Sequence, residues 1–343
     1  LAADNYFTSF ITSDIEPIVM LILFLGASAF VIFRGVNKGI ESFSKVIMPA
    51  LLLLVVAIAV FSLTLSHTDS NGATRTGLEG LKVYVIPNLS GLTVKSFFST
   101  LLDAMGQLFY SLSVAMGIMI AYGSYVRDDA NLNKSINQIE IFDTVVAFLA
   151  GVMIIPAVYT FSGIEGMDAS GPSLMFISLP KVFAAMGFVG NIIGCLFFAM
   201  VLFAALTSAV SVMEAVVSSL MDNFKLSRVK SASIEGIIAL VAGILVCLGY
   251  NIMYFEASLP NGATGQLLDI MDYVSNNILM PIVAIGTCVL IGWIVKPKTV
   301  IDEVEKSGNK MGRKRLYTIM IKFVAPAMLV LLFLKSVGIL TVI

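Results

Sequence analysis

Long apolar segments alternate with shorter polar connections along most of the chain. A helix needs about 20 mostly apolar residues to cross the hydrocarbon core of a bilayer. Eight segments approach or exceed this length: residues 16–32, 46–65, 94–126, 133–161, 188–221, 234–254, 267–295 and 317–340. The pattern predicts an all-α, polytopic membrane protein with about eight transmembrane helices.

Several of these segments are longer than a straight crossing requires. Residues 188–221 would extend about 50 Å at 1.5 Å per residue, so a helix there must tilt or protrude from the bilayer. A proline inside a membrane segment frees carbonyls that only neighbouring helices or water can satisfy. Four segments contain one: Pro49, Pro156, Pro281 and Pro326. Long, interrupted helices of this kind are typical of transporter bundles.

The composition agrees with the pattern and excludes several classes of protein. Hydrophobic residues make up 58% and charged residues 13% of the chain, with a mean hydropathy of +0.96 and a net charge of −1. Such a chain is not a soluble domain, and no basic excess indicates a nucleic-acid partner. Cys195, Cys247 and Cys288 lie in apolar runs without metal-ligand spacing, so we expect neither zinc nor disulfides. No HExxH or GxSxG motif indicates an enzyme.

The basic residues fall mainly in alternate loops, and this asymmetry predicts the orientation. The loops that carry most of them are expected to be cytoplasmic, which places both ends of this chain outside. The connections 66–93 and 163–187, the second with an Asp-Ala-Ser-Gly-Pro turn, are then external and long enough to form lids. The cytoplasmic set is Arg34, Lys38, Lys45, Arg127, Lys134, Lys225, Arg228, Lys230, Lys296, Lys298, Lys306, Lys310, Arg313, Lys314 and Arg315.

Small and hydroxyl residues recur every three or four positions in segment 188–221 and just beyond it. They are Ala204, Thr207, Ser208, Ser211, Ala215, Ser218, Ser219 and Asp222. This spacing places them on one stripe of a helix. The stripe is either a surface for close helix packing, with hydroxyls bonded to their own carbonyls, or a polar path with oxygen ligands for a small cation.

Two acids lie inside apolar segments. If the helix begins at the capping signals around Asn131 and Asn133, Asp143 is roughly 15 Å along it, where an ionisable group is costly and functional by default. If the helix begins near Ile141, Asp143 is a solvated acid of the first turn. Glu214, in the next long segment, raises the same question. Two acids in neighbouring spans favour the handling of a cation.

The segment 94–126 has polar groups on more than one face, so it cannot be wholly exposed to lipid. Its middle contains Ser111, Ser113, Ala115 and Gly117. Either a continuous buried helix or a discontinuous helix fits this pattern. A discontinuous helix would offer free amides and carbonyls to ions and zwitterions near the bilayer midplane.

At these residues the sequence resembles the neurotransmitter:sodium symporter family, especially its bacterial amino-acid transporters. The resemblance rests on Arg-Gly-Val-Asn-Lys-Gly-Ile-Glu at 34–41, Gly-Gln-Leu-Phe-Tyr-Ser-Leu-Ser at 106–113, Tyr-Gly-Ser-Tyr at 122–125 and Ala-Ala-Leu-Thr-Ser at 204–208. It implies the leucine-transporter fold, with residues 1–343 as one transmembrane transporter domain equivalent to helices 4–11. Family helices 1–3 have no counterpart in this sequence. The sequence begins at Leu1 without an initiator methionine or a signal peptide, so we expect it to be part of a longer protein.

The resemblance also implies roles for particular residues. Ser111 and Asp143 would contribute to one sodium site; the Ala204 carbonyl with the Thr207 and Ser208 hydroxyls would contribute to a second, each set being incomplete here. The implied substrate contacts are Tyr110, also an outer gate, with Ser111, Ser113, Met116, Ser208 and Val212. Asp272 would belong to the outer gate, and Asp222 with Tyr125 to the inner gate.

The function that the resemblance implies is sodium-coupled symport of amino acids by alternating access, in the inner (plasma) membrane. Met116 and Val212 would line an apolar pocket, which favours a hydrophobic or aromatic amino acid. The Asp143 carboxylate would supply negative charge that other members take from chloride, so chloride should not be required. The alternative is a non-transporting membrane binding or regulatory protein that retains part of the fold, and a sodium requirement for ligand binding would separate the two.

Overall fold

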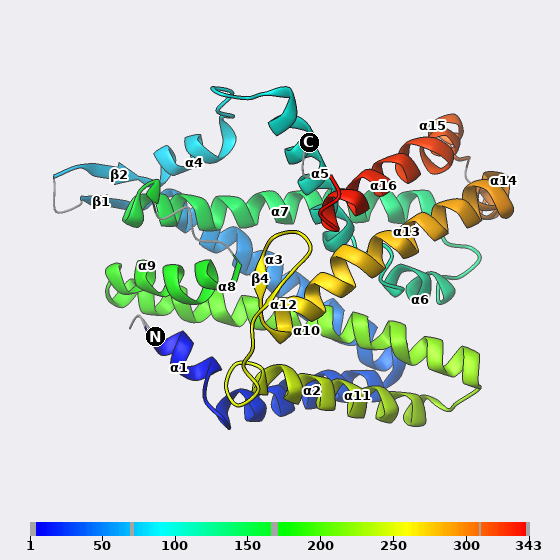
Figure 1. The fold of residues 1–343 in the computed structure, drawn as a ribbon, viewed down its shortest axis with the longest axis horizontal. Helices are drawn as coiled ribbons and strands as arrows, with labels where there is room; N and C mark the ends of the chain where they lie inside the picture. Colours follow the sequence, from blue (N-terminus) through cyan, green and yellow to red (C-terminus); the bar gives the residue numbers. More distant parts are fainter. Residues whose placement is uncertain (1–4, 69–71, 166–170, 309, 341–343) are drawn as a thin grey trace. The chain divides into compact units, whose positions relative to one another are not determined.

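The computed structural model describes residues 5–68, 72–165, 171–308 and 310–340. It is built almost wholly from helices, with two small two-stranded sheets (Figure 1). Among the described residues, seven helices are long and apolar enough to cross a membrane. The all-α, multi-pass architecture is therefore confirmed. The difference from the expected eight lies in residues 94–126, which form two shorter helices.

The chain divides into two compact units, which are described separately. Unit 1 comprises residues 1–90 and 144–210, and unit 2 comprises residues 91–143 and 211–343. The long helices α7 (Leu132–Ser162) and α10 (Phe188–Phe224) each contribute to both units.

Unit 1 contains the first apolar helices and a β-hairpin. Besides its parts of α7 and α10, it consists of α1 (Tyr6–Ile11), α2 (Glu16–Phe33), η1 (Val36–Glu41), α3 (Ser42–Leu63), β1 (Ser66–Thr68), β2 (Thr74–Thr76), α4 (Gly77–Val85), α8 (Gly171–Ser173), η3 (Leu174–Ser178) and α9 (Leu179–Ala185). The strands β1 and β2 pair antiparallel, with His67 opposite Arg75.

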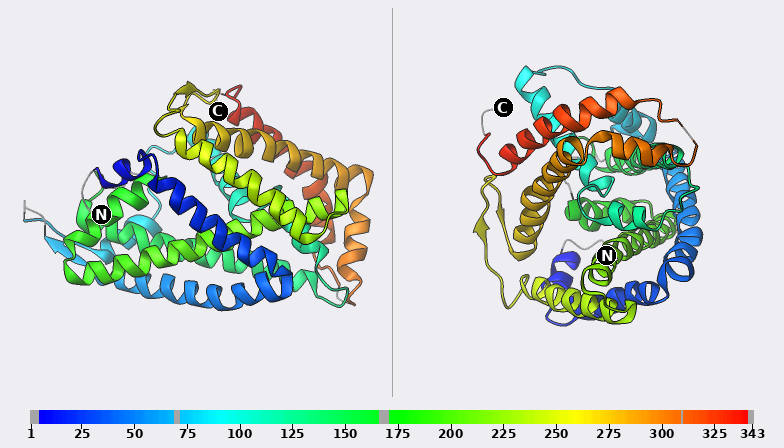
Figure 2. Two further views of the ribbon diagram at one scale, coloured as in Figure 1. Left: turned by 90° about the horizontal axis from the view of Figure 1, so that it is seen from below. Right: turned by 90° about the vertical axis from the view of Figure 1, so that its right-hand side faces the viewer.

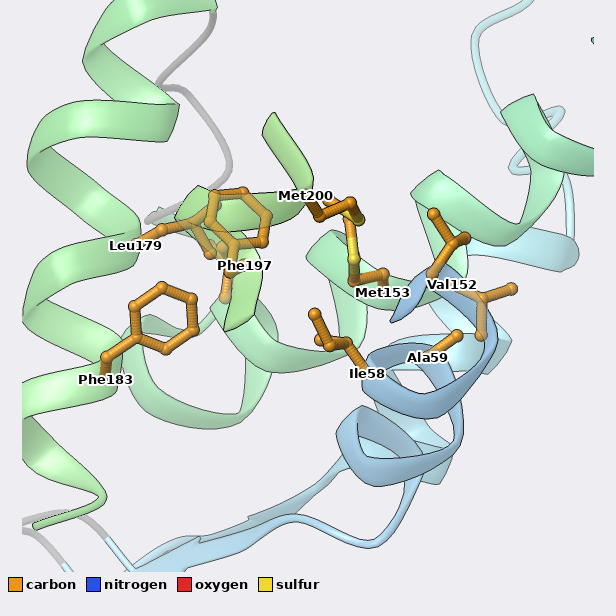
Figure 3. Close-up of a cluster of buried hydrophobic side chains, with 10 residues drawn as sticks. Ile58, Ala59, Val152, Met153, Leu179, Phe183, Phe197 and Met200 are labelled. Carbon is orange, nitrogen blue, oxygen red and sulfur yellow. The ribbon is translucent and has the colours of Figure 1, made fainter. Parts of the chain in front are cut away.

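The core of unit 1 brings together helices that are distant in sequence. Ile58 and Ala59 of α3, Val152 and Met153 of α7, Leu179 and Phe183 of α9, and Phe197 and Met200 of α10 form one buried cluster (Figure 3). At Gly80 of α4 an added Cβ would lie 2.6 Å from the Pro156 Cα, so a glycine lets α4 rest on α7. The two connections expected as lids therefore place α4 and α9 against buried surface. Asp168, Ala169 and Ser170 of the expected turn lie outside the described residues.

Besides its parts of α7 and α10, unit 2 contains the helices of residues 91–131 and 225–340. They are α5 (Val94–Ser111), α6 (Ile118–Ser124), α11 (Arg228–Leu248), α12 (Leu267–Asp272), η4 (Tyr273–Leu279), α13 (Met280–Val289), η5 (Leu290–Ile294), α14 (Pro297–Glu305), α15 (Lys314–Ile319), η6 (Met320–Val324) and α16 (Ala325–Ser336), with strands β3 (Ala257–Ser258) and β4 (Thr264–Gly265). The helices α13 and α16 run side by side (Figure 2), with Ala284, Cys288 and Leu329 buried between them.

Two of the four membrane prolines follow π-helical turns. Pro281 is the second residue of α13, which follows η4 directly, and Pro326 is the second residue of α16, which follows η6 directly. Proline has no N–H and its ring crowds the preceding turn, so the wider π-turn relieves both problems without ending the helix. Pro49 and Pro156 instead lie inside the continuous helices α3 and α7.

Candidate functional site

The segment 94–126 is a discontinuous helix. The helix α5 ends at Ser111 and α6 begins at Ile118 (Figure 1). Between them Ser113, Ala115 and Gly117 have positive φ values of 54°, 64° and 80°. The left-handed conformation costs a non-glycine residue roughly 1–2 kcal/mol. Of the two arrangements that the sequence allowed, the continuous helix is wrong.

The break leaves main-chain oxygens available. Within the described part of the chain, no main-chain hydrogen bond ends on the carbonyls of residues 112–116. The C-terminal end of α5 also carries partial negative charge, because its last carbonyls have no partner in the helix. This stretch of unit 2 can therefore offer oxygen ligands to a small cation.

The break lies beside the acid that the sequence singled out. The Ser111 hydroxyl, at the end of α5, donates a hydrogen bond of 2.5 Å to the Asp143 Oδ1 atom. The helix α7 begins at Leu132, and the Asn131 side chain accepts from the Lys134 amide at 3.0 Å. Asp143 is therefore about 16 Å along α7. The alternative start near Ile141 is wrong, and Asp143 is not an acid of the first turn.

The predicted substrate residues of unit 2 cluster around the same break. Tyr110 and Ser111 form the last residues of α5, and Ser113 and Met116 lie in the non-helical stretch. Tyr110 is 56% exposed. Val212 belongs to the part of α10 in unit 2 and is likewise exposed.

The second predicted cation set lies on α10 within unit 1. The Thr207 hydroxyl is buried and donates to the Ala204 carbonyl at 2.9 Å and to the Phe203 carbonyl at 3.2 Å; Ser208 is exposed. These bonds are the local ones expected of a packing stripe. A hydroxyl that donates its proton keeps its lone pairs, so the same geometry leaves the Thr207 oxygen able to accept a cation.

The residues expected at the gates have different surroundings. Asp272, the last residue of α12, accepts a hydrogen bond of 2.6 Å from the Asn276 side chain. Asp222 is exposed near the end of α10, and among the described residues its side chain has no ion pair. Tyr125 donates to Glu214 at 2.7 Å and not to Asp222.

Glu214 is the centre of a buried network that the sequence interpretation missed. Its carboxylate is 0% exposed and forms two bonds with the Arg228 guanidinium, at 3.0 and 2.5 Å. The Tyr125 hydroxyl donates to the same carboxylate, and nearby Tyr122 and Ser211 share a hydrogen bond of 2.7 Å. A bidentate guanidinium is the strongest partner that a buried carboxylate can have. Glu214 is therefore held by Arg228, which answers for this acid the question that the sequence left open.

A single local signal pointed to this pairing. Only residues 225–227 separate α10 from α11, so the first residue of α11, Arg228, folds back beside the last turns of α10. The count of basic residues in the loops places Arg228 with the cytoplasmic set. Such a count takes no account of loop length, and this loop is too short to keep Arg228 away from α10.

These features describe a multi-pass membrane transporter with a helix broken at its middle. A model of the sodium:neurotransmitter symporter family matches residues 10–342. The chain belongs to this family. Its members are secondary transporters, not enzymes, and use of sodium and binding of a small-molecule substrate in a membrane follow from membership.

Individual relatives agree with this assignment. The chain is 32% identical over 337 residues to an uncharacterized sodium-dependent transporter, YhdH, of Bacillus subtilis, covering 98% of this chain and 70% of the relative. It is 30% identical to an uncharacterized sodium-dependent transporter of Haemophilus influenzae, covering 97% and 68%. The crystal structure of MhsT in complex with L-phenylalanine matches with a TM-score of 0.81 and 30% identity, covering 98% of this chain and 72% of MhsT.

Proposed function

We propose that this chain is the greater part of a sodium-coupled symporter of hydrophobic or aromatic amino acids that works by alternating access in the plasma membrane. The observation that carries the proposal is the broken helix of unit 2, where carbonyls that accept no main-chain hydrogen bond from the described residues lie next to the Ser111 and Asp143 pair. Hard oxygen ligands of this kind suit a small cation, and midplane helix breaks are typical binding sites of secondary transporters. The phenylalanine bound to the similar MhsT supports an apolar or aromatic substrate.

The proposal assigns two sodium sites. Ser111 and Asp143 contribute to the first; the Ala204 carbonyl with the Thr207 and Ser208 hydroxyls contribute to the second. Tyr110, Ser113, Met116 and Val212 contact the substrate, Asp272 belongs to the outer gate, and Tyr125 and Asp222 to the inner gate. The fixed charge of Asp143 makes chloride unnecessary.

Equilibrium binding tests this proposal. The protein encoded by the complete reading frame should be purified. Binding of labelled L-phenylalanine and L-leucine to it should be measured in sodium gluconate and in potassium gluconate. We expect saturable binding in sodium that is at least ten-fold weaker in potassium. Equal binding in both salts would favour the non-transporting binding protein.

The α10 set gives a prediction about the second sodium site. Thr207→Val combined with Ser208→Ala replaces two hydroxyls with methyl groups that cannot offset the dehydration of a cation. We expect the sodium concentration for half-maximal uptake to rise several-fold. Ser218→Ala, which removes another buried hydroxyl of the same stripe bonded to its own helix, is the matched control. An unchanged sodium dependence in the double variant would assign the stripe to packing.

Met116 gives a prediction about the substrate pocket. Met116→Ala removes the side-chain atoms beyond Cβ from the non-helical stretch. A change of this size in an apolar pocket alters the discrimination between substrates by about 1–3 kcal/mol. We expect the preference for large over small apolar amino acids to fall by roughly ten-fold or more. Competition by a series from alanine to phenylalanine measures it, and an unaltered series would remove Met116 from the site.

A further inference from the structure

Unit 2 carries a dense basic surface around the connection between α13 and α16. Residues 296–322 contain eight lysines and arginines and three acids. Lys306 pairs with Asp128 at 2.9 Å, and Lys314 pairs with Glu305 at 2.7 Å. The hydrogen bond from Lys314 holds the pKa of Glu305 below its usual range, and the bond to Asp128 raises the pKa of Lys306. Within the segment itself, Glu305 is therefore engaged by Lys314, and Glu303 lies 3.8 Å from Lys306.

The other six cations have no carboxylate within 4.0 Å in the part of the chain that the structure describes. They are Lys296, Lys298, Lys310, Arg313, Arg315 and Lys322, and all but Lys322 are exposed. An excess of unpaired positive charge on one short stretch of a membrane protein can attract anionic headgroups, at about 1 kcal/mol for each basic residue near the surface.

An aromatic pair fixes one of these cations within the helical region. Trp293 of η5 and Phe323 of η6 meet edge to face at 5.6 Å between ring centroids, and the Lys322 ammonium lies 5.5 Å from the Trp293 centroid. Gly292 permits this approach, since an added Cβ would lie 3.1 Å from the Ile321 carbonyl oxygen. Both rings are more than half exposed. The ammonium therefore lies beside the Trp293 ring on an exposed aromatic surface.

The positions of these residues match the depth of a headgroup. Lys322 follows Lys314 by eight residues, about 12 Å along the helix, and a lysine side chain can extend back toward the membrane surface. Trp293 precedes Lys296 and Lys298 by less than two turns, and tryptophan prefers the interface between headgroups and acyl chains. In this arrangement the Trp293 ring and the Lys322 ammonium lie at the boundary with the acyl chains, and the exposed guanidinium groups lie closer to the membrane surface.

We propose that Trp293, Lys296, Lys298, Arg313, Arg315 and Lys322 form a binding site for the headgroup of an anionic phospholipid from the adjacent leaflet. The basic side chains bind the phosphate and the rings support the glycerol and the first acyl carbons. This site is separate from the broken helix, and it does not rest on the proposed transport function.

Trp293 is the only tryptophan of the 343 residues, so it reports on this site directly. The complete protein and a Trp293→Phe variant are reconstituted in vesicles of phosphatidylcholine with a minor fraction of brominated phosphatidylglycerol or brominated phosphatidylcholine. The fluorescence difference between the two proteins isolates the Trp293 signal. We expect brominated phosphatidylglycerol to quench that signal several-fold more efficiently than its zwitterionic counterpart.

Variants separate this site from the general charge of the protein. Lys322→Gln and Arg315→Gln should each lower the preference for phosphatidylglycerol about five-fold, the equivalent of ~1 kcal/mol per charge. Lys322→Arg should keep it. Lys95→Gln, which removes an exposed lysine of α5 without an ion pair in the described residues, should also leave it unchanged. Equal quenching by the two lipids, an equal loss in Lys95→Gln, or displacement by free glycerol phosphate would overturn the proposal.

Discussion

Asp143→Asn is expected to weaken sodium binding by ten-fold or more and to make uptake respond to chloride. At about 2.4 Å and an effective dielectric constant near 20, a unit charge attracts a monovalent cation by ~7 kcal/mol, of which dehydration offsets the larger part. Asparagine keeps an oxygen at the same place and loses only the charge. The effect is therefore electrostatic, and an added anion could partly replace the missing charge.

Sodium-stimulated uptake of the complete protein measures this effect, in chloride and in gluconate. The wild type should need the same sodium concentration for half-maximal uptake in both salts. Asp143→Asn should need more sodium than the wild type, and this increase should be smaller in chloride than in gluconate. Ser111→Ala is the comparison variant, because it removes a neutral oxygen ligand of the same proposed site and the hydrogen bond to Asp143 but leaves the carboxylate. Its loss should be smaller and independent of chloride. Identical sodium curves for wild type and Asp143→Asn would end the assignment of Asp143 to the cation.

Arg228→Met is expected to destabilise the folded protein by about 3–5 kcal/mol. The substitution leaves the Glu214 carboxylate, which is 0% exposed, with the Tyr125 hydroxyl as its one remaining hydrogen-bond donor among the described residues. Breaking a buried pair from one side costs this much because a charge stays buried without compensation.

The double variant Glu214→Gln with Arg228→Met distinguishes this cause from lost packing. Removing both charges should recover most of the stability, since two neutral groups of similar volume carry a much smaller desolvation penalty than a buried charge without its partner. Tyr125→Phe removes one hydrogen bond to a charged group and should cost about 1.5–3 kcal/mol. Thermal unfolding of the purified protein in detergent measures all three. A double variant that is no more stable than Arg228→Met would show that the guanidinium acts by packing.

Much of the architecture could be predicted from the sequence. The apolar segments gave the multi-pass helical class, because length and hydropathy decide membrane insertion. The capping residue Asn131 correctly placed the start of α7, and with it the depth of Asp143. Local signals of this kind are readable because they act within one turn of the chain.

The break in segment 94–126 could not be decided in the same way. A glycine at Gly117 permits positive φ, but Ser113 and Ala115 adopt it against their own preference. Residues do so only when tertiary surroundings impose the conformation, and those surroundings are not visible in the local sequence. The sequence therefore allowed both a continuous and a discontinuous helix.

The role of Glu214 also depended on tertiary structure. Its partner Arg228 is fourteen residues away and belongs to the next helix, so neither helical spacing nor composition pairs the two. An apolar helix with one acid looks the same whether the acid meets a cationic ligand or an arginine. Only the short connection at residues 225–227 indicated which of the two applies here.

Uptake against an amino-acid concentration gradient is the decisive test of sodium-coupled symport by this protein. The complete protein is reconstituted in proteoliposomes with labelled L-phenylalanine or L-leucine outside, with an inward sodium gradient and with gluconate as the only anion. We expect one or both amino acids to accumulate inside above the external concentration, and we expect the accumulation to collapse when sodium is equilibrated. Equal internal and external concentrations under the intact sodium gradient, by a protein that binds the amino acid, would contradict it.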